Sequence, residues 1–263
     1  MSNIKATKRS SQYAPKPLAK RSLFVILPAL LIGLAGCDSQ SKATFNFECP
    51  DEQLVQLDLL DLSSSGRKRD VLDERLKAIQ LDVERVTDCE GRLTILGWAV
   101  SSTSSFKIFD GALATTGATE IGRDRKISDA VILTMAEIRS GLTEAFVKID
   151  PVGSNLFGAF SIAEDHYKTL GNNQLLEINI YSDAITNVSA NSVNEAGLTQ
   201  EQAIKSAQIT TGIELADVQV KIMGVGKTGN QIPQAPQEYV LKLRMYAEEM
   251  CKNTKAICTI LTA

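Results

Sequence analysis

Apolar residues recur along the chain at two spacings, one typical of strands and the other of helices. Mostly apolar segments of strand length cover residues 54–60, 93–100, 106–113, 176–181, 218–225 and 256–261. Apolar residues at steps of three and four predict helices over 71–86, 128–139, 156–170, 199–209 and 236–250. This alternation predicts an α/β fold: a doubly wound, mostly parallel central sheet with one antiparallel edge strand and helices on both faces.

The antiparallel strand comes from a hairpin. The serine-rich segment 101–105 joins the second and third strand runs and reads as the hairpin turn. The segments that leave strands are long, such as 184–198 and 226–236, whereas the returns from helices are short. In a wound sheet the carboxyl ends of the parallel strands share one rim, where ligands bind. We therefore expect the functional site on that rim.

The first 36 residues form a separate segment. They carry six basic residues and no acidic one, and end in an apolar run of 14 residues, too short for a spanning helix of about 20. The sequence Leu34-Ala35-Gly36-Cys37 resembles the lipobox of bacterial lipoproteins. The resemblance implies a signal peptide (1–36), acylation of Cys37, for example by palmitate, a tether (37–50) and one domain (51–263). An uncleaved anchor is the alternative. Asp38 resembles the signal that retains lipoproteins in the inner membrane, on the periplasmic side of the cell envelope.

The charge and the cysteine content indicate which partners and which kinds of cross-link to expect. All 31 acidic residues but only 22 of the 28 basic ones follow residue 36, which gives the mature chain a formal charge of −9. Such a surface disfavours nucleic acid as a partner. Four cysteines besides Cys37 suit disulfides in an oxidising compartment, with three possible connectivities. A zinc site is the rival reading, but the chain has one histidine and no Cys-x-x-Cys pair.

Three segments of the rim carry clustered oxygen donors. Asp61, Ser63 and Ser65 follow the first strand, Ser154 precedes the helix at 156, and Asp183 follows the strand at 176–181. Carboxylates and hydroxyls without histidine or thiolate suit Mg²⁺, Mn²⁺ or Ca²⁺. We therefore predict a divalent cation site at these five residues.

These residues resemble the metal-ion-dependent adhesion site of the von Willebrand factor A domain. That family has Asp-x-Ser-x-Ser after the first strand, matched by Asp61, Ser63 and Ser65, and a later aspartate, matched by Asp183. Ser154 stands where the family has threonine, so the hydroxyl is kept and the methyl is lost. The resemblance implies that Ser63 and Ser65 bind the cation, that Asp61 and Asp183 hold its waters, and that a protein partner supplies an Asp or Glu to the metal.

The fold implied by this resemblance also favours one disulfide pattern. Cys49 precedes the first strand and Cys89 ends the helix that runs back beside it, whereas Cys251 and Cys258 flank a short turn. We therefore expect Cys49 to pair with Cys89 and Cys251 with Cys258, both away from the metal rim.

Three alternatives remain open. In the first, Asp61 caps a helix and binds no metal. The protein would then be a structural lipoprotein with a vestigial metal site. In another, the metal serves a Mg²⁺-dependent hydrolase or phosphatase. We expect no enzyme, because His166 falls more than three turns into its helix and reads as a surface residue, and no nucleotide-binding motif is present. In the third, Trp98 or Tyr181 is exposed for partner contact, although core packing is the expected role.

Overall fold

The computed structural model describes residues 47–262, apart from 116–118, 172, 189–191, 195–196 and 230–234. The predicted signal peptide, Cys37 and most of the tether lie outside these residues. Residues Ala43–Ala263 form one compact unit. Within the described residues, no helix is both long and apolar enough to cross a membrane.

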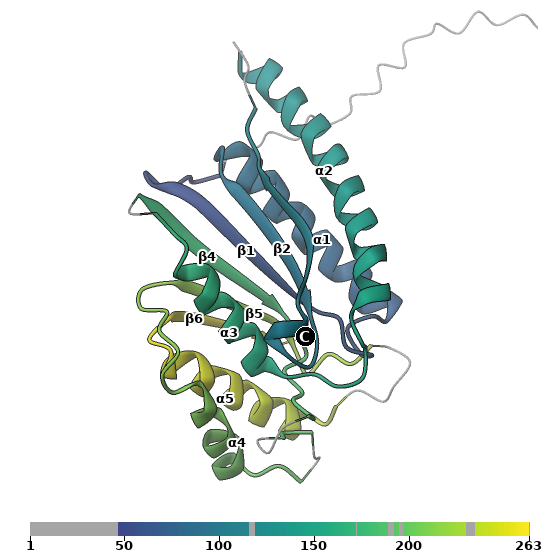
Figure 1. Ribbon diagram of the computed structural model, residues 1–263, viewed down its shortest axis with the longest axis vertical. Helices are drawn as coiled ribbons and strands as arrows, with labels where there is room; N and C mark the ends of the chain where they lie inside the picture. The colour runs from purple at the N-terminus through teal and green to yellow at the C-terminus, as the bar shows by residue number, and fades with distance from the viewer. Residues whose placement is uncertain are drawn as a thin grey trace, which may run out of the picture. The chain divides into compact units, whose positions relative to one another are not determined.

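Six strands form one sheet in the order β3-β2-β1-β4-β5-β6 (Figure 1). The strands are β1 (Gln53–Asp61), β2 (Arg92–Trp98), β3 (Phe106–Ala112), β4 (Gln174–Tyr181), β5 (Gln219–Val225) and β6 (Ile257–Thr262). All neighbouring pairs are parallel except β2 and β3. The predicted mostly parallel sheet with one antiparallel edge strand is confirmed, and so is the hairpin.

Helices cover both faces of the sheet, as predicted (Figure 1). They are α1 (Arg69–Asp88), α2 (Glu120–Lys148), α3 (Leu156–Tyr167), α4 (Gln200–Ala207) and α5 (Gln237–Asn253). One hydrophobic core lies between the sheet and α1 with α2, and a second lies between the sheet and α3, α4 and α5. Trp98 and Tyr181 are buried in these cores, with exposed fractions of 0 and 2%. Their predicted packing role is confirmed.

Helix α2 differs most from the prediction, since it begins eight residues before Ser128 and ends nine after Arg139. Thr119 is its N-cap and accepts a hydrogen bond from the N–H of Gly122. Ser128 lies inside the helix, where its hydroxyl donates to the carbonyl oxygen of Asp124. The first two turns are largely polar, so they lack the apolar periodicity on which the prediction depended.

Both predicted disulfides are present. The Cα atoms are 5.3 Å apart in Cys49–Cys89 and 6.2 Å apart in Cys251–Cys258. Cys89 follows α1 and Cys258 lies near the start of β6, so both bridges are at the end of the sheet opposite the rim. Each is expected to stabilise the fold by roughly 2 to 4 kcal/mol without touching the candidate site.

Candidate metal centre

The loop between β1 and α1 carries the first three predicted ligands. Asp61 is the last residue of β1 and is completely buried, and its Oδ1 accepts a hydrogen bond of 2.9 Å from the N–H of Ser63. The hydroxyl oxygens of Ser63 and Ser65 are 3.2 Å apart. A side chain at Gly66 would collide with the carbonyl oxygen of Asp61, so glycine lets the loop close tightly. The loop folds back over the carboxylate and brings two hydroxyls together.

Ser154 reaches the same point from the segment between α2 and α3. Gly153 before it has φ of +90°, which favours glycine, and a side chain there would also collide with Val188. The N–H of Ser154 donates to Asn187 Oδ1 at 2.9 Å, and its hydroxyl donates to Asp61 Oδ2 at 2.8 Å. The hydroxyl therefore takes its place in the cluster without the methyl of a threonine.

The third segment follows β4, which pairs in parallel with β1 and so ends beside it. The hydroxyl of Ser65 donates to Asp183 Oδ2 at 2.6 Å, and the hydroxyl of Ser182 donates to Asp61 Oδ2 at 2.8 Å. The other oxygen of Asp183 accepts from the N–H of Ile185 at 2.9 Å. Both carboxylates are thus held by hydroxyl and amide donors from the three segments.

Burial gives the two carboxylates unusual electrostatics. It raises the pKa of Asp183 to about 6, and the nearby charge of Asp61 acts in the same direction. Hydrogen bonds from Ser65 and from the N–H of Ile185, together with the charge of Arg75, oppose this rise in pKa. An ionised Asp183 is therefore costly here unless further positive charge arrives.

Arg75 of α1 is the basic group next to the site. It is 7% exposed, and its Nη1 donates to the carbonyl oxygen of Asp61 at 2.7 Å. Burial lowers the pKa of Arg75, while the charges of Asp61 and Asp183 act in the opposite direction. One guanidinium faces two carboxylates, so the fully ionised cluster keeps an excess of negative charge.

The structure brings all five predicted residues into one hydrogen-bonded cluster. Ser182 and Arg75 also contact the cluster, and neither was predicted as a site residue. Ser182 directly precedes Asp183 and was visible in the sequence, but Arg75 reaches the site only through the packing of α1. Within the described part of the chain, no three His, Cys, Asp or Glu side chains gather as a possible metal site. Any cation here would rely on hydroxyl oxygens beside the two carboxylates.

The helix-cap interpretation of Asp61 is wrong. Helix α1 begins at Arg69, its N-cap residue is Lys68, and no side chain caps it. Asp61 lies eight residues before the helix, and its carboxylate accepts hydrogen bonds from Ser63, Ser154 and Ser182 instead.

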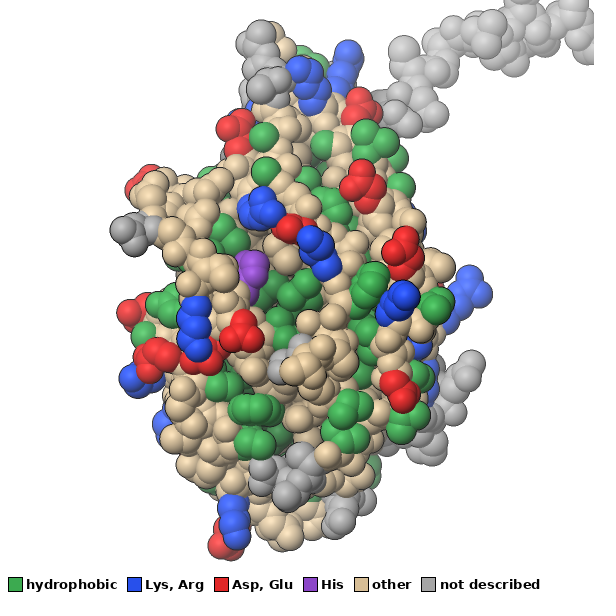
Figure 2. Space-filling model, in the orientation of Figure 1, with side chains coloured by type: hydrophobic (Ala, Val, Ile, Leu, Met, Phe, Trp, Pro, Cys, Tyr) green, Lys and Arg blue, Asp and Glu red, His purple; other side chains and the backbone are tan. Residues whose placement is uncertain are grey.

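His166 lies at the surface of α3, as predicted, where its side chain is half-buried. It is the purple side chain visible on the face shown in Figure 2. Burial lowers its pKa, and the charge of Asp110 acts in the opposite direction. It lies ten residues into α3, roughly 15 Å along the helix axis from Leu156, which begins the helix beside the site.

No protein-family model and no curated protein sequence matches this chain. Among solved structures, it is similar to the conserved hypothetical protein BatB from Bacteroides thetaiotaomicron, with 15% identity and a TM-score of 0.38, over 80% of this chain and 90% of that one. It is also similar to a von Willebrand factor type A structure from Catenulispora acidiphila, with 12% identity and a TM-score of 0.44, over 81% of this chain and 39% of that one. Similarities of this size say nothing about what this chain binds.

Proposed function

We propose that this protein is a membrane-anchored binding module, which engages a protein partner through a divalent cation at the rim of its sheet. The residues that would hold the cation are Asp61, Ser63, Ser65, Ser154 and Asp183. Mg²⁺ is the expected ion, with Mn²⁺ or Ca²⁺ as substitutes. The partner would supply an Asp or Glu, in an assembly, secretion or conjugation apparatus of the envelope.

One observation carries this proposal. Three segments far apart in the sequence place three serine hydroxyls and two buried carboxylates within hydrogen-bonding distance of one another. Hard oxygen donors of this kind fit Mg²⁺ and Mn²⁺. A bound cation would supply positive charge beside two buried carboxylates, which offsets the cost of ionising Asp183.

The donor set also favours binding over hydrolysis. Most of the groups beside the cation are neutral hydroxyls, so the ion would keep much of its charge for an incoming carboxylate. Two exposed apolar residues, Val152 and Val188, flank the cluster, with exposed fractions of 70 and 40%. We propose that a partner contacts them beside its acidic residue, because exposed apolar groups next to a polar anchor suit protein recognition.

The anchor is a separate part of the proposal and rests on the lipobox at Leu34–Cys37. Two or more acyl chains hold a protein stably on a membrane, whereas one does not. A Cys37→Ala variant should therefore leave the membrane fraction or stay unprocessed, whereas wild type should sediment with membranes. Equal membrane association of processed wild type and variant would contradict lipidation at Cys37.

Cation affinity should depend on pH, because a proton and a metal ion compete for Asp183. Since its pKa is raised to about 6, affinity should fall about tenfold per pH unit below 6 and change little above pH 7. Calorimetric titration with Mg²⁺ at several pH values measures this. Affinity that is constant from pH 5 to pH 8 would argue against Asp183 as part of the site.

The raised pKa of Asp183 also determines how the stability of the fold should change with pH. Without metal, the Asp183 contribution to stability is present below its unfolded pKa near 3.8 and is lost as the pH rises through about 6. Added Mg²⁺ should restore stability above pH 6, since it favours the ionised form. Thermal unfolding with and without Mg²⁺ provides an independent readout of the titration.

A further inference from the structure

Strand β1 carries two buried polar side chains that do not belong to the rim. Gln56 and Asp58 are two residues apart on the strand, so both side chains point to the face that α1 covers, and their exposed fractions are 1 and 0%. Strands in the middle of a parallel sheet are normally apolar on both faces. Polar side chains at such positions therefore require specific partners.

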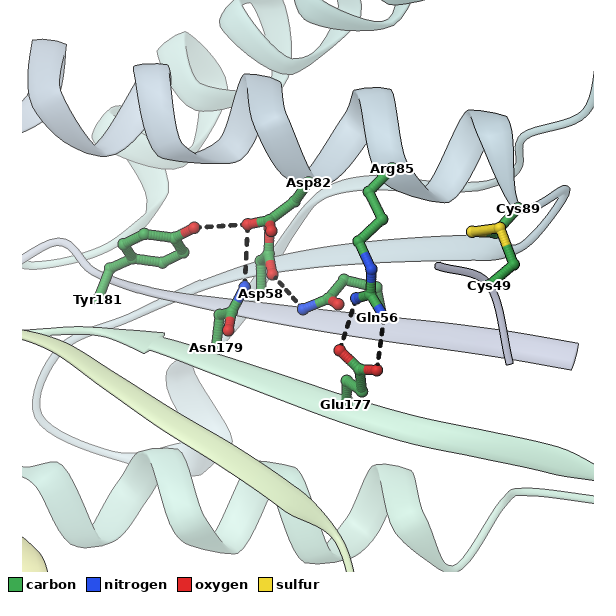
Figure 3. A network of polar contacts seen from close by, with 9 residues as sticks. All are labelled: Cys49, Gln56, Asp58, Asp82, Arg85, Cys89, Glu177, Asn179 and Tyr181. Atoms are coloured by element: carbon green, nitrogen blue, oxygen red, sulfur yellow. Dashed lines mark hydrogen bonds and ion pairs between the residues drawn. A yellow bond between two sulfur atoms is a disulfide. The ribbon is translucent and has the colours of Figure 1, made fainter. Parts of the chain in front are cut away.

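Asp82 of α1 faces Asp58 across the core, as Figure 3 shows. Asp82 Oδ2 accepts hydrogen bonds from Asn179 Nδ2 at 2.9 Å and from the Tyr181 hydroxyl at 2.6 Å. Asp58 Oδ1 accepts one, from Gln56 Nε2 at 2.9 Å. The donors are thus distributed unequally: two reach Asp82 and one reaches Asp58.

The second oxygen of Asp58 is the unexplained atom. Asp58 Oδ2 is buried and has no hydrogen-bond donor among the described residues. An ionised carboxylate with an unpaired buried oxygen is costly, whereas a protonated oxygen becomes a donor and needs only an acceptor. The carboxylate of Asp82, whose side chain interacts with that of Asp58, can provide that acceptor.

The basic groups nearest the pair either form their hydrogen bonds elsewhere or are exposed. Arg85 of α1 makes two hydrogen bonds, of 2.6 and 2.7 Å, to Glu177 of β4. Arg75 is directed to the carbonyl oxygen of Asp61, and Lys221 of β5 is exposed. Among the described residues, no salt bridge joins a basic group to Asp58 or Asp82. The face of β2 beside the pair is apolar, with Leu93 and Ile95.

We propose that Asp58 and Asp82 form a carboxyl–carboxylate pair that holds one proton at neutral pH and thereby fastens α1 to the sheet. The proton resides on Asp58 Oδ2 and is donated to Asp82, which remains ionised. Every donor is then matched by an acceptor: Gln56 to Asp58, Asp58 to Asp82, and Asn179 and Tyr181 to Asp82.

The electrostatic environment agrees with this arrangement. Burial raises the pKa of Asp58 well above its usual range, and the charge of Asp82 acts in the same direction, whereas hydrogen bonds from Gln56 and Asn179 oppose the rise without cancelling it. Burial also raises the pKa of Asp82, but hydrogen bonds from Tyr181 and Asn179 and the charge of Lys221 oppose that rise. The proton therefore belongs on Asp58.

The Asp58–Asp82 pair should make the stability of the fold depend on pH. Because the pKa of Asp58 is raised on folding, its contribution to stability is present below the unfolded pKa and is lost as the pH rises through the folded pKa. Ionisation of both groups would place two like charges between β1 and α1. Helix α1 follows the loop of Ser63 and Ser65, so release of the helix would also loosen that loop.

Two matched substitutions test the asymmetry. In Asp58→Asn, the amide oxygen can still accept from Gln56 and the amide nitrogen can donate to Asp82, so the melting temperature at neutral pH should stay within about 2 °C of wild type. In Asp82→Asn, the same change leaves Asn179 and Tyr181 with a poorer acceptor, and the melting temperature should fall by about 5 °C or more. Asp73→Asn, on the exposed side of α1, controls for loss of a surface charge.

Infrared difference spectra provide a readout that packing alone would not change. Wild type minus Asp58→Asn at neutral pH should contain the carbonyl stretch of a protonated carboxylic acid, and this band should disappear at alkaline pH. Equal destabilisation by both variants, failure of Asp58→Asn to fold, or absence of the band would overturn the proposal. So would stabilisation by Mg²⁺ or Ca²⁺ that is lost in Asp58→Asn but kept in Asp61→Asn, since the pair would then be a metal site.

Discussion

Asp61→Asn should weaken Mg²⁺ binding by about 100-fold while leaving the protein folded. The carboxylate of Asp61 accepts from the Ser63 N–H and from the hydroxyls of Ser154 and Ser182. An amide keeps the shape but has one oxygen instead of two, so it cannot hold these donors and the waters of a cation together. Calorimetric titration with Mg²⁺ and Mn²⁺ measures the loss, and circular dichroism checks the fold.

Two further substitutions serve as matched controls. Asp150→Asn removes an exposed acid from the same rim, outside the cluster, and should bind Mg²⁺ as wild type does. Ser154→Thr keeps the hydroxyl and should keep binding. Capture of envelope proteins on the immobilised domain should require Mg²⁺, be abolished by EDTA, and fail with Asp61→Asn. Metal-independent capture that Asp61→Asn leaves unchanged would remove the metal bridge from the account.

Trp98→Ala should lower the free energy of unfolding by about 3 to 5 kcal/mol. Trp98 is fully buried and ends β2 directly beside Asp61 of β1. Its carbonyl oxygen accepts from the N–H of Leu62 at 2.7 Å, and its indole N–H donates to the carbonyl oxygen of Asn155 at 3.3 Å. Trp98 thus forms hydrogen bonds with two of the three loops of the site, so cation affinity should fall together with stability.

Urea unfolding monitored by circular dichroism tests this prediction. Trp98→Phe retains much of the buried surface and should cost less than the alanine variant. Ile132→Ala changes a residue of α2 that is 67% exposed and should stay within about 0.5 kcal/mol of wild type. A loss below about 1 kcal/mol for Trp98→Ala would show that the site does not depend on this packing.

The architecture could be predicted because apolar periodicity and local chemistry agree along most of the chain. The strand at 54–60 is a mostly apolar run of strand length, and the Thr199–Gln202 capping box, present in the structure, marks the start of α4. The start of α2 could not be predicted in the same way, since its first turns are polar and contain Gly122. Its N-cap, Thr119, gave only a weak local signal.

The candidate site could be assembled from the sequence because each part follows a strand or precedes a helix. Once the sheet was predicted to be parallel, Asp61 and Asp183 had to meet at one rim. Arg75 and the Asp58–Asp82 pair were out of reach, because they depend on which face of α1 packs on which strand. The sequence does contain one sign of the pair: Gln56 and Asp58 are polar residues, two apart, within a mostly apolar strand.

Anomalous diffraction from crystals grown with Mn²⁺ can locate the cation that we propose at the rim. We expect a manganese peak at the rim, within about 2 Å of the hydroxyl oxygens of Ser63 and Ser65, with Asp61 and Asp183 close by. The peak should be absent from crystals of Asp61→Asn grown in the same way. A wild-type structure with no peak at the rim, or with manganese bound elsewhere, would contradict the account.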